Sequence, residues 1–188
     1  MYMGLERGAI YSGEQLTNSG SFKIEMKIDS VDFDQEIMYG TFQIHNLTDK
    51  YELLSSFFES VMMGNKYEFA GDETDTVHWG MFPEWRNELK KQRERPIHNN
   101  KNKHDLASYK IKESDFIYLK IKELFLLPDP NLKSIPGASI DGYYYCCYYK
   151  KLDCFAGHYY FKNATNQVSQ QILLERVFKK TSQEATFS

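Results

Sequence analysis

The chain has 188 residues, of which 41% are hydrophobic and 15% aromatic, and its formal net charge at pH 7 is −3. This length allows one well-buried core but not two domains of ordinary size, so we expect a single domain over residues 1–188. This net charge gives no electrostatic argument for binding to nucleic acid or to an anionic membrane, so neither is expected as a partner. The 14 Tyr and 13 Phe are typical of a β-rich fold with an apolar interior.

The cysteines and the amino-terminal segment indicate the compartment. Cys146, Cys147 and Cys154 lie close together without C-x-x-C spacing, an odd set that predicts free thiols in a reducing environment. The first eleven residues contain no apolar stretch typical of a secretory signal, and no later run is long enough to cross a bilayer. We therefore expect a cytoplasmic or nuclear protein. The five histidines lack metal-ligand spacing and no cofactor motif is present, so no metal and no cofactor are expected.

The first half of the chain contains the patterns of several strands. In residues 22–28 apolar and charged side chains alternate, which predicts a half-buried strand. Residues 36–45 alternate in the same way. Residues 57–63 and 66–69 are predicted to form a hairpin around Gly64-Asn65, because glycine and asparagine favour tight turns.

An insertion with helical and polar parts is predicted at about residues 74–113. Residues 74–93 have the pattern of a helix that Pro83 divides into two pieces. From there to residue 113 the composition is charged and rich in Asn, which predicts a mobile polar segment. Upstream, Thr48 is expected to cap a short helical turn that contains Leu53-Leu54.

Strand patterns return at residues 115–127, 141–149, 154–161 and about 170–177. With the earlier segments this makes about eight strands, mostly in adjacent hairpins, with helices confined to the insertion. The chain is therefore predicted to be mainly β, a closed antiparallel β-barrel of the lipocalin-like kind. A two-sheet sandwich is the alternative, and the aromatic content favours a barrel that contains a cavity.

Glu123 breaks the apolar pattern of its strand. Side chains alternate between the two faces of a strand, so Glu123 is predicted to point into the barrel. A buried carboxylate costs several kcal/mol, as an order of magnitude, unless it is paired or hydrogen-bonded. Two explanations are open. The Glu123 carboxylate is solvated or paired near the barrel rim, or it binds a cationic group of a ligand. The absence of Lys and Arg from the same face favours the second. The residues expected on its face are Ile117, Leu119, Ile121 and Phe125.

Six stretches occur in an order and spacing that is similar to a known family. They are residues 11–15 (YSGEQ), 57–59 (FFE), 78–82 (HWGMF), 122–129 (KELFLLPD), 137–145 (GASIDGYYY) and 157–160 (GHYY). On these stretches the chain resembles the substrate-receptor family of the glucose-induced degradation (GID, or CTLH) E3 ubiquitin ligase, also known from vacuolar import and degradation. The resemblance extends from about residue 8 to residue 177.

The resemblance implies a barrel whose narrow end binds the extended, free N-terminus of a substrate protein, typically one that begins with proline. Glu123 matches the position that receives the α-amine, assisted by Tyr144, while Gln15 and Ser139 match positions that bond the first peptide groups. Gly137 matches a glycine of the binding loop. The positions that match the apolar pocket are Ile24, Phe42, Ile44, Leu47, Leu54, Ile140 and Tyr159.

The resemblance also implies a non-catalytic role and a second partner. Phe187 lies near the chain terminus, as in relatives whose C-terminal segment docks on an armadillo-type scaffold subunit of the ligase. Two other function classes are open on the residues alone. A lipocalin-like small-molecule carrier would need a wholly apolar cavity, and an enzyme using Glu123 and Tyr144 would need a nucleophile or cofactor motif that the sequence lacks.

Overall fold

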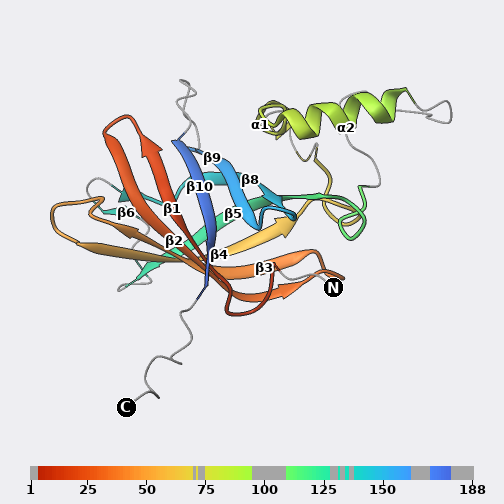
Figure 1. The fold of residues 1–188 in the computed structure, drawn as a ribbon. Helices are drawn as coiled ribbons and strands as arrows, with labels where there is room; N and C mark the ends of the chain where they lie inside the picture. Colours follow the sequence, from red (N-terminus) through yellow and green to blue (C-terminus); the bar gives the residue numbers. More distant parts are fainter. Residues whose placement is uncertain are drawn as a thin grey trace, which may run out of the picture.

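Eight antiparallel strands form a closed barrel in the computed structural model, in the order β1-β10-β9-β8-β5-β4-β3-β2, with β1 paired to β2 (Figure 1). The structure describes residues 4–69, 71, 75–94, 109–127, 131, 134–135, 138–161 and 170–178. Closure confirms the barrel and excludes the sandwich. The barrel strands are β1 (Ile10–Thr17), β2 (Gly20–Asp32), β3 (Ile37–His45), β4 (Leu53–Met62), β5 (Phe116–Leu127), β8 (Tyr143–Tyr149), β9 (Cys154–Tyr160) and β10 (Gln170–Val177).

The helical insertion lies between β4 and β5 and has the predicted division. It contains α1 (Asp75–Trp79) and α2 (Pro83–Arg93), and Pro83 stands at the start of α2. Proline suits this place because the first helical residues have no intrahelical partner for their N–H groups. Two short strands, β6 (Ser134–Ile135) and β7 (Ala138–Ser139), pair with each other apart from the barrel. No helix in the described ranges is long and apolar enough to span a membrane.

Two sequence predictions about strands are wrong. Residues 66–69 are not the second arm of a hairpin, because the Glu36 carboxylate accepts hydrogen bonds from the backbone N–H groups of Asn65 (3.0 Å) and Lys66 (2.8 Å) and holds this segment as a loop. Leu53-Leu54 begin β4 instead of continuing a helical turn. No helical turn forms at Thr48, because residues 46–50 are bends, although its hydroxyl accepts a hydrogen bond from Tyr51 N–H at 3.3 Å.

Strand β1 was not predicted, although it closes the barrel between β2 and β10. Its inward positions include the polar Gln15, so simple apolar alternation is absent. Its centre, Gly13, lies so close to β10 that an added Cβ would lie 1.7 Å from the carbonyl oxygen of Leu173. The close approach of two backbones therefore explains the glycine, which the sequence pattern alone would place in a turn.

A β-bulge in β5 changes which side chains face the interior. Glu123 pairs with Phe58, and Phe125 pairs with the adjacent Phe57, so Leu124 is an extra residue and is 38% exposed. Beyond the bulge the parity is reversed. Phe125 lies on the outer face, where its ring stacks on Phe57 at 5.4 Å, and Leu126 points inward instead. The prediction that Phe125 shares the face of Glu123 is therefore wrong.

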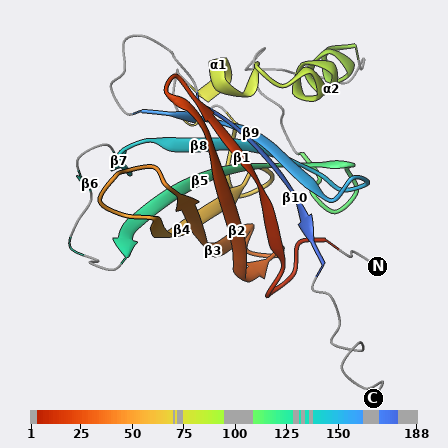
Figure 2. The same cartoon turned by 60° about the vertical axis from the view of Figure 1, so that its left-hand side comes forward.

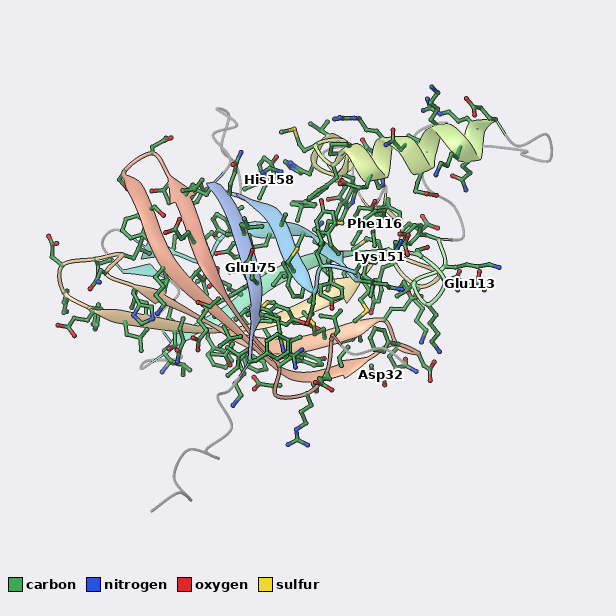
Figure 3. The ribbon with its side chains drawn as sticks, in the orientation of Figure 1. Asp32, Glu113, Phe116, Lys151, His158 and Glu175 are labelled. Carbon is green, nitrogen blue, oxygen red and sulfur yellow. The ribbon has the colours of Figure 1, made fainter. Side chains whose placement is uncertain are left out.

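The buried apolar cluster of the protein extends beyond the barrel interior to the outer surface beneath α1 and α2. Figure 2 shows these two helices outside the barrel. Tyr118, on the outer face of β5, is fully buried there and its ring lies 5.5 Å from that of Phe69 and 6.0 Å from that of Trp79. Trp79 donates its indole N–H to the carbonyl of Phe69 at 3.1 Å. These contacts show that the insertion is packed onto the barrel as part of the same folded unit. His158 of β9 lies on the same side of the barrel as α1 (Figure 3).

The end of the barrel near Asp32 and Lys151, both labelled in Figure 3, is filled by a polar network. Asp153 accepts hydrogen bonds from the hydroxyls of Tyr11 and Tyr148, each at 2.6 Å. Arg176 lies 3.8 Å from the same carboxylate. Because both tyrosines are fully buried, this end leaves no room for a ligand between them.

The buried ion pair between α1 and the barrel predicts a measurable loss of stability. Asp75, whose side chain is 4% exposed, accepts hydrogen bonds from Lys120 (3.0 Å) and from the Tyr145 hydroxyl (2.7 Å). Asp75→Ala leaves both donors without this acceptor and should lower the free energy of unfolding by about 3 kcal/mol in urea titrations. The matched control, Asp115→Ala, removes the exposed pair with Lys151 and should cost less than about 1 kcal/mol. Equal losses in the two variants would contradict the assignment.

Candidate functional site

One end of the barrel holds a cavity of about 470 Å³, with walls from most of the strands and from the residues that follow β7. Its surface is mixed, with aliphatic and aromatic side chains around a smaller number of hydroxyl, amide and carboxylate groups. The lining residues are Gln15, Ile24, Phe42, Ile44, Leu47, Leu54, Ser55, Ser56, Glu123, Leu126, Ser139, Ile140, Asp141, Tyr144, Tyr159, Phe161 and Gln170. We refer to this cavity as the barrel pocket.

Glu123 is the acid inside the barrel pocket. Its carboxylate accepts a hydrogen bond from the hydroxyl of Ser56 on the neighbouring strand β4. Burial raises the pKa of Glu123 to about 7, and the Ser56 hydrogen bond and the charge of Lys122 only partly oppose this. Near neutral pH the empty protein therefore holds this carboxyl between its two protonation states, so a cation in the pocket would favour ionisation.

A chain of hydrogen bonds crosses the pocket between β8, β1 and β10. The buried Tyr144 hydroxyl donates to the side-chain oxygen of Gln15 at 3.2 Å, and the Gln15 amide donates to Gln170 at 2.5 Å. Burial and the charge of Glu123 raise the pKa of Tyr144 well above its usual value, so its phenol stays neutral. Since the Tyr144 proton points to Gln15, the tyrosine oxygen is free to accept a hydrogen bond from a donor in the pocket.

One wall of the pocket is formed by a segment that we call the strap, Ser139–Gly142, which comprises the last residue of β7 and the three residues after it. The Lys122 ammonium donates to the carbonyls of Ile140 and Gly142, the latter at 3.1 Å. The Tyr159 hydroxyl accepts from Gly142 N–H at 2.9 Å and lies 3.3 Å from the carbonyl of Ser139, to which it donates. Four hydrogen bonds therefore attach the strap to the rigid strands β5 and β9.

The structure brings eleven of the predicted site residues into this one cavity. They are Gln15, Ile24, Phe42, Ile44, Leu47, Leu54, Glu123, Ser139, Ile140, Tyr144 and Tyr159. Their roles toward a ligand stay predictions. Gly137 and Phe187 lie outside the described residues, as does most of the polar segment predicted before residue 113.

Sequence reasoning missed six lining residues, for different reasons. Ser56 shares the inward parity of Leu54 and Phe58, so alternation along β4 could have found it. Leu126 faces inward only because of the bulge, which no local pattern reveals. Asp141 lies between two predicted pocket residues, Ile140 and Tyr144, but no pattern in the sequence marks it as a lining residue. The missed residues are Ser55, Ser56, Leu126, Asp141, Phe161 and Gln170.

The chemistry of the pocket is that of binding. Two carboxylates, those of Glu123 and Asp141, line it, and no Lys or Arg is among its described lining residues. Within the described ranges no group of three or more His, Cys, Asp or Glu side chains is arranged to hold a metal ion. The arrangement therefore suits a partly apolar ligand that carries positive charge.

The architecture is that of a closed β-barrel filled at one end, with an acid in a mixed polar and apolar pocket at the other. Comparison with known proteins specifies the family. Residues 4–177 match the family described as "Vacuolar import and degradation protein", and the chain belongs to this family.

Three relatives illustrate the similarity. The chain is 30% identical over 166 residues to "Glucose-induced degradation protein 4 homolog" of Mus musculus, covering 85% of this chain and 72% of that one. It is 26% identical over 189 residues to "GID complex substrate-recognition subunit 10" of Saccharomyces cerevisiae, covering 83% and 63%. It is 22% identical over 231 residues to "GID complex substrate-recognition subunit 4" of the same yeast, covering 94% and 64%. The chain thus spans less than two thirds of the length of either yeast protein.

The raised pKa of Glu123 predicts a pH-dependent stability of the empty protein. A carboxyl whose pKa is about 7 when folded binds its proton more tightly than in the unfolded chain, so its contribution is present in acid and lost as the pH rises toward 7. Glu123→Gln cannot ionise and keeps a hydrogen-bond partner for Ser56. It should match the wild type at pH 4.5 and exceed its free energy of unfolding by about 2 kcal/mol at pH 8.

Urea titrations at the two pH values measure this difference. Glu14→Gln, which changes an exposed carboxylate on β1, is the control and should not change the pH trend. A Glu123→Gln protein less stable than the wild type at pH 8 would show that the carboxylate is compensated within the protein.

Proposed function

We propose that this chain is a substrate-recognition subunit of a GID-type E3 ubiquitin ligase and binds the free N-terminus of substrate proteins, with proline preferred as first residue. The family match and the names of the relatives support the receptor role. The contents of the barrel pocket support the finer statement. As a receptor the chain would bind substrates and leave ubiquitin transfer to other subunits.

The observation that carries the proposal is that the buried Glu123 carboxyl has a raised pKa and, among the described residues, only a hydroxyl partner in the pocket. Its hydrogen-bond partner in the pocket is a hydroxyl, burial raises its pKa to about 7, and no basic side chain is among the described lining residues. An α-ammonium group is a compact cation at the end of a chain, and it can enter a pocket that an internal peptide segment cannot. Its charge would compensate the carboxylate, and its N–H groups can also reach acceptors such as the Tyr144 oxygen.

The walls fit the first side chains of an extended peptide. Ile24, Phe42 and Leu54 are each at most 4% exposed and offer an apolar surface beside the acid. Proline combines an ionisable secondary amine with a compact apolar ring, which suits both features. Gln15 and Ser139 carry amide and hydroxyl groups at the pocket surface, where they would bond the first peptide groups.

The proposal includes an armadillo-type scaffold subunit of the ligase as second partner, contacted through the terminal segment that contains Phe187. It also places the protein in the cytoplasm or nucleus. The three cysteines are all buried free thiols, which is consistent with a reducing compartment.

Peptide binding tests the amine site. A labelled peptide that begins with Pro should bind the wild type in fluorescence anisotropy, and its N-acetylated copy should bind at least about tenfold more weakly because the cation is lost. Glu123→Gln should lose at least about tenfold in affinity for the free peptide and nothing for the acetylated one. Thermal unfolding at pH 7 checks that the variant is folded.

Two results would contradict this proposal. Equal binding of free and acetylated peptides would exclude an amine site. Displacement of an apolar dye by fatty acids, with no effect of peptides, would favour a small-molecule carrier.

The same site predicts a bell-shaped dependence of affinity on pH. Below pH 7 the Glu123 carboxyl is increasingly protonated and cannot pair with the amine, so affinity should fall, approaching about tenfold per pH unit. Above roughly pH 8 the α-amine loses its own proton and affinity should fall again. Titration calorimetry between pH 5.5 and 9.5 measures this profile. The acid limb should be absent in Glu123→Gln, and an acid limb that persists there would assign it to another group.

A further inference from the structure

Asp141 is the second carboxylate of the barrel pocket, and it differs from Glu123 in its surroundings. It is exposed to solvent, whereas Glu123 lies on an inward-facing strand position. It lies on the strap Ser139–Gly142, so it borders the pocket where a bound chain would leave for solvent. The pocket therefore has an acid inside and another at its opening.

The backbone on both sides of Asp141 is held in place. Lys122 bonds the carbonyls of Ile140 and Gly142, and Tyr159 bonds the N–H of Gly142. The Asp141 N–H itself donates to the hydroxyl of Ser139 at 3.3 Å. The carboxylate thus projects from a fixed backbone, so an ion pair with it would not require a loop to become ordered.

The Asp141 carboxylate is available to a ligand. In the part of the chain that the structure describes, it has no ion pair and no side-chain hydrogen bond. The Lys122 ammonium is bound to the carbonyls that flank it. The described residues that line the pocket include two carboxylates and no Lys or Arg.

We propose that Asp141 is a specificity-determining residue that favours N-terminal segments with a Lys or Arg soon after the first residue. The inference rests on the proposed function, since it takes the α-amine to be bound at Glu123. A peptide held there extends about 3.3–3.6 Å per residue, so one of its next few side chains passes the strap. A basic side chain at that position would pair with Asp141, and an acidic one would be repelled.

The pair would be solvent-exposed, so its effect is moderate and sensitive to salt. Exposed ion pairs change affinity by a factor of about 2 to 5. Screening at high ionic strength should remove most of this gain, whereas the partly buried amine site should be affected less. The dependence of affinity on salt concentration therefore distinguishes the contribution of Asp141 from that of Glu123.

A peptide series tests the inference. Labelled peptides that begin with Pro would carry Lys, Gln or Glu in turn at positions two to five, each with an N-acetylated copy. At one or two positions Lys should bind about 2- to 5-fold more tightly than Gln at 50 mM salt, and Glu more weakly. Asp141→Asn should abolish these differences, while its free Gln peptides still bind more tightly than their acetylated copies, and Asp141→Lys should reverse the order of Lys and Glu. Thermal unfolding confirms that both variants are folded.

The outcomes separate this inference from the proposed function. If the free Pro peptides bind better than their acetylated copies but Lys has no advantage, or the advantage persists in Asp141→Asn, Asp141 does not determine specificity and the amine site stands. If free and acetylated peptides bind alike, or none binds, both proposals are overturned.

Discussion

An acid inside an apolar barrel must find a compensating partner, and the neighbouring structure offers Glu123 only part of one. Ser56 donates a hydrogen bond, yet burial still raises the Glu123 pKa to about 7. A fold under selection for stability alone would have an apolar residue or a cation here. The barrel instead holds the carboxylate in a cavity, where a ligand can supply the missing charge. The other features of the site follow from this arrangement.

The rest of the fold offsets the loss of stability that comes from burying the Glu123 carboxylate. The far end is filled by Tyr11 and Tyr148, which share the carboxylate of Asp153. Outside the barrel, α1 and α2 cover the aromatic face of β5 and extend the apolar cluster beyond the barrel interior. With this extended apolar cluster, the fold can accommodate a partly compensated acid and a cavity at one end. The cavity and its buried acid thus lower the free energy of unfolding by a few kcal/mol, as an order of magnitude, and the large apolar interior offsets this loss.

Two local irregularities shape the pocket. The bulge at Leu124 turns Phe125 outward and Leu126 inward, so the strand that carries Glu123 continues as an aliphatic wall. The strap Ser139–Gly142 is irregular backbone, but Lys122 and Tyr159 hold it to the barrel. Rigid strands thus position the inner acid and the tied strap positions the outer one, as expected of a pre-organised binding site.

The sequence by itself determined the fold class, most strands, the divided helix and the inward direction of Glu123. These depend on alternation with period two and on Pro83, which are local properties of the chain. The family resemblance added the neighbours of Glu123, ten of which the structure places with it in one cavity. Strand β1 was missed because the polar Gln15 interrupts its apolar face, and the hairpin at residues 66–69 was wrong because Glu36, distant in sequence, holds that loop.

Only the tertiary structure decided the reversal of parity after Glu123, the place of Asp141 and the partner of the inner carboxylate. A bulge arises from the register between two strands, and neither strand contains it alone. The strap is positioned by side chains from β5 and β9, and the pKa of Glu123 depends on what surrounds it in space. The sequence therefore determined that an acid faces the interior, while contacts between distant segments determined that the described residues compensate it only in part.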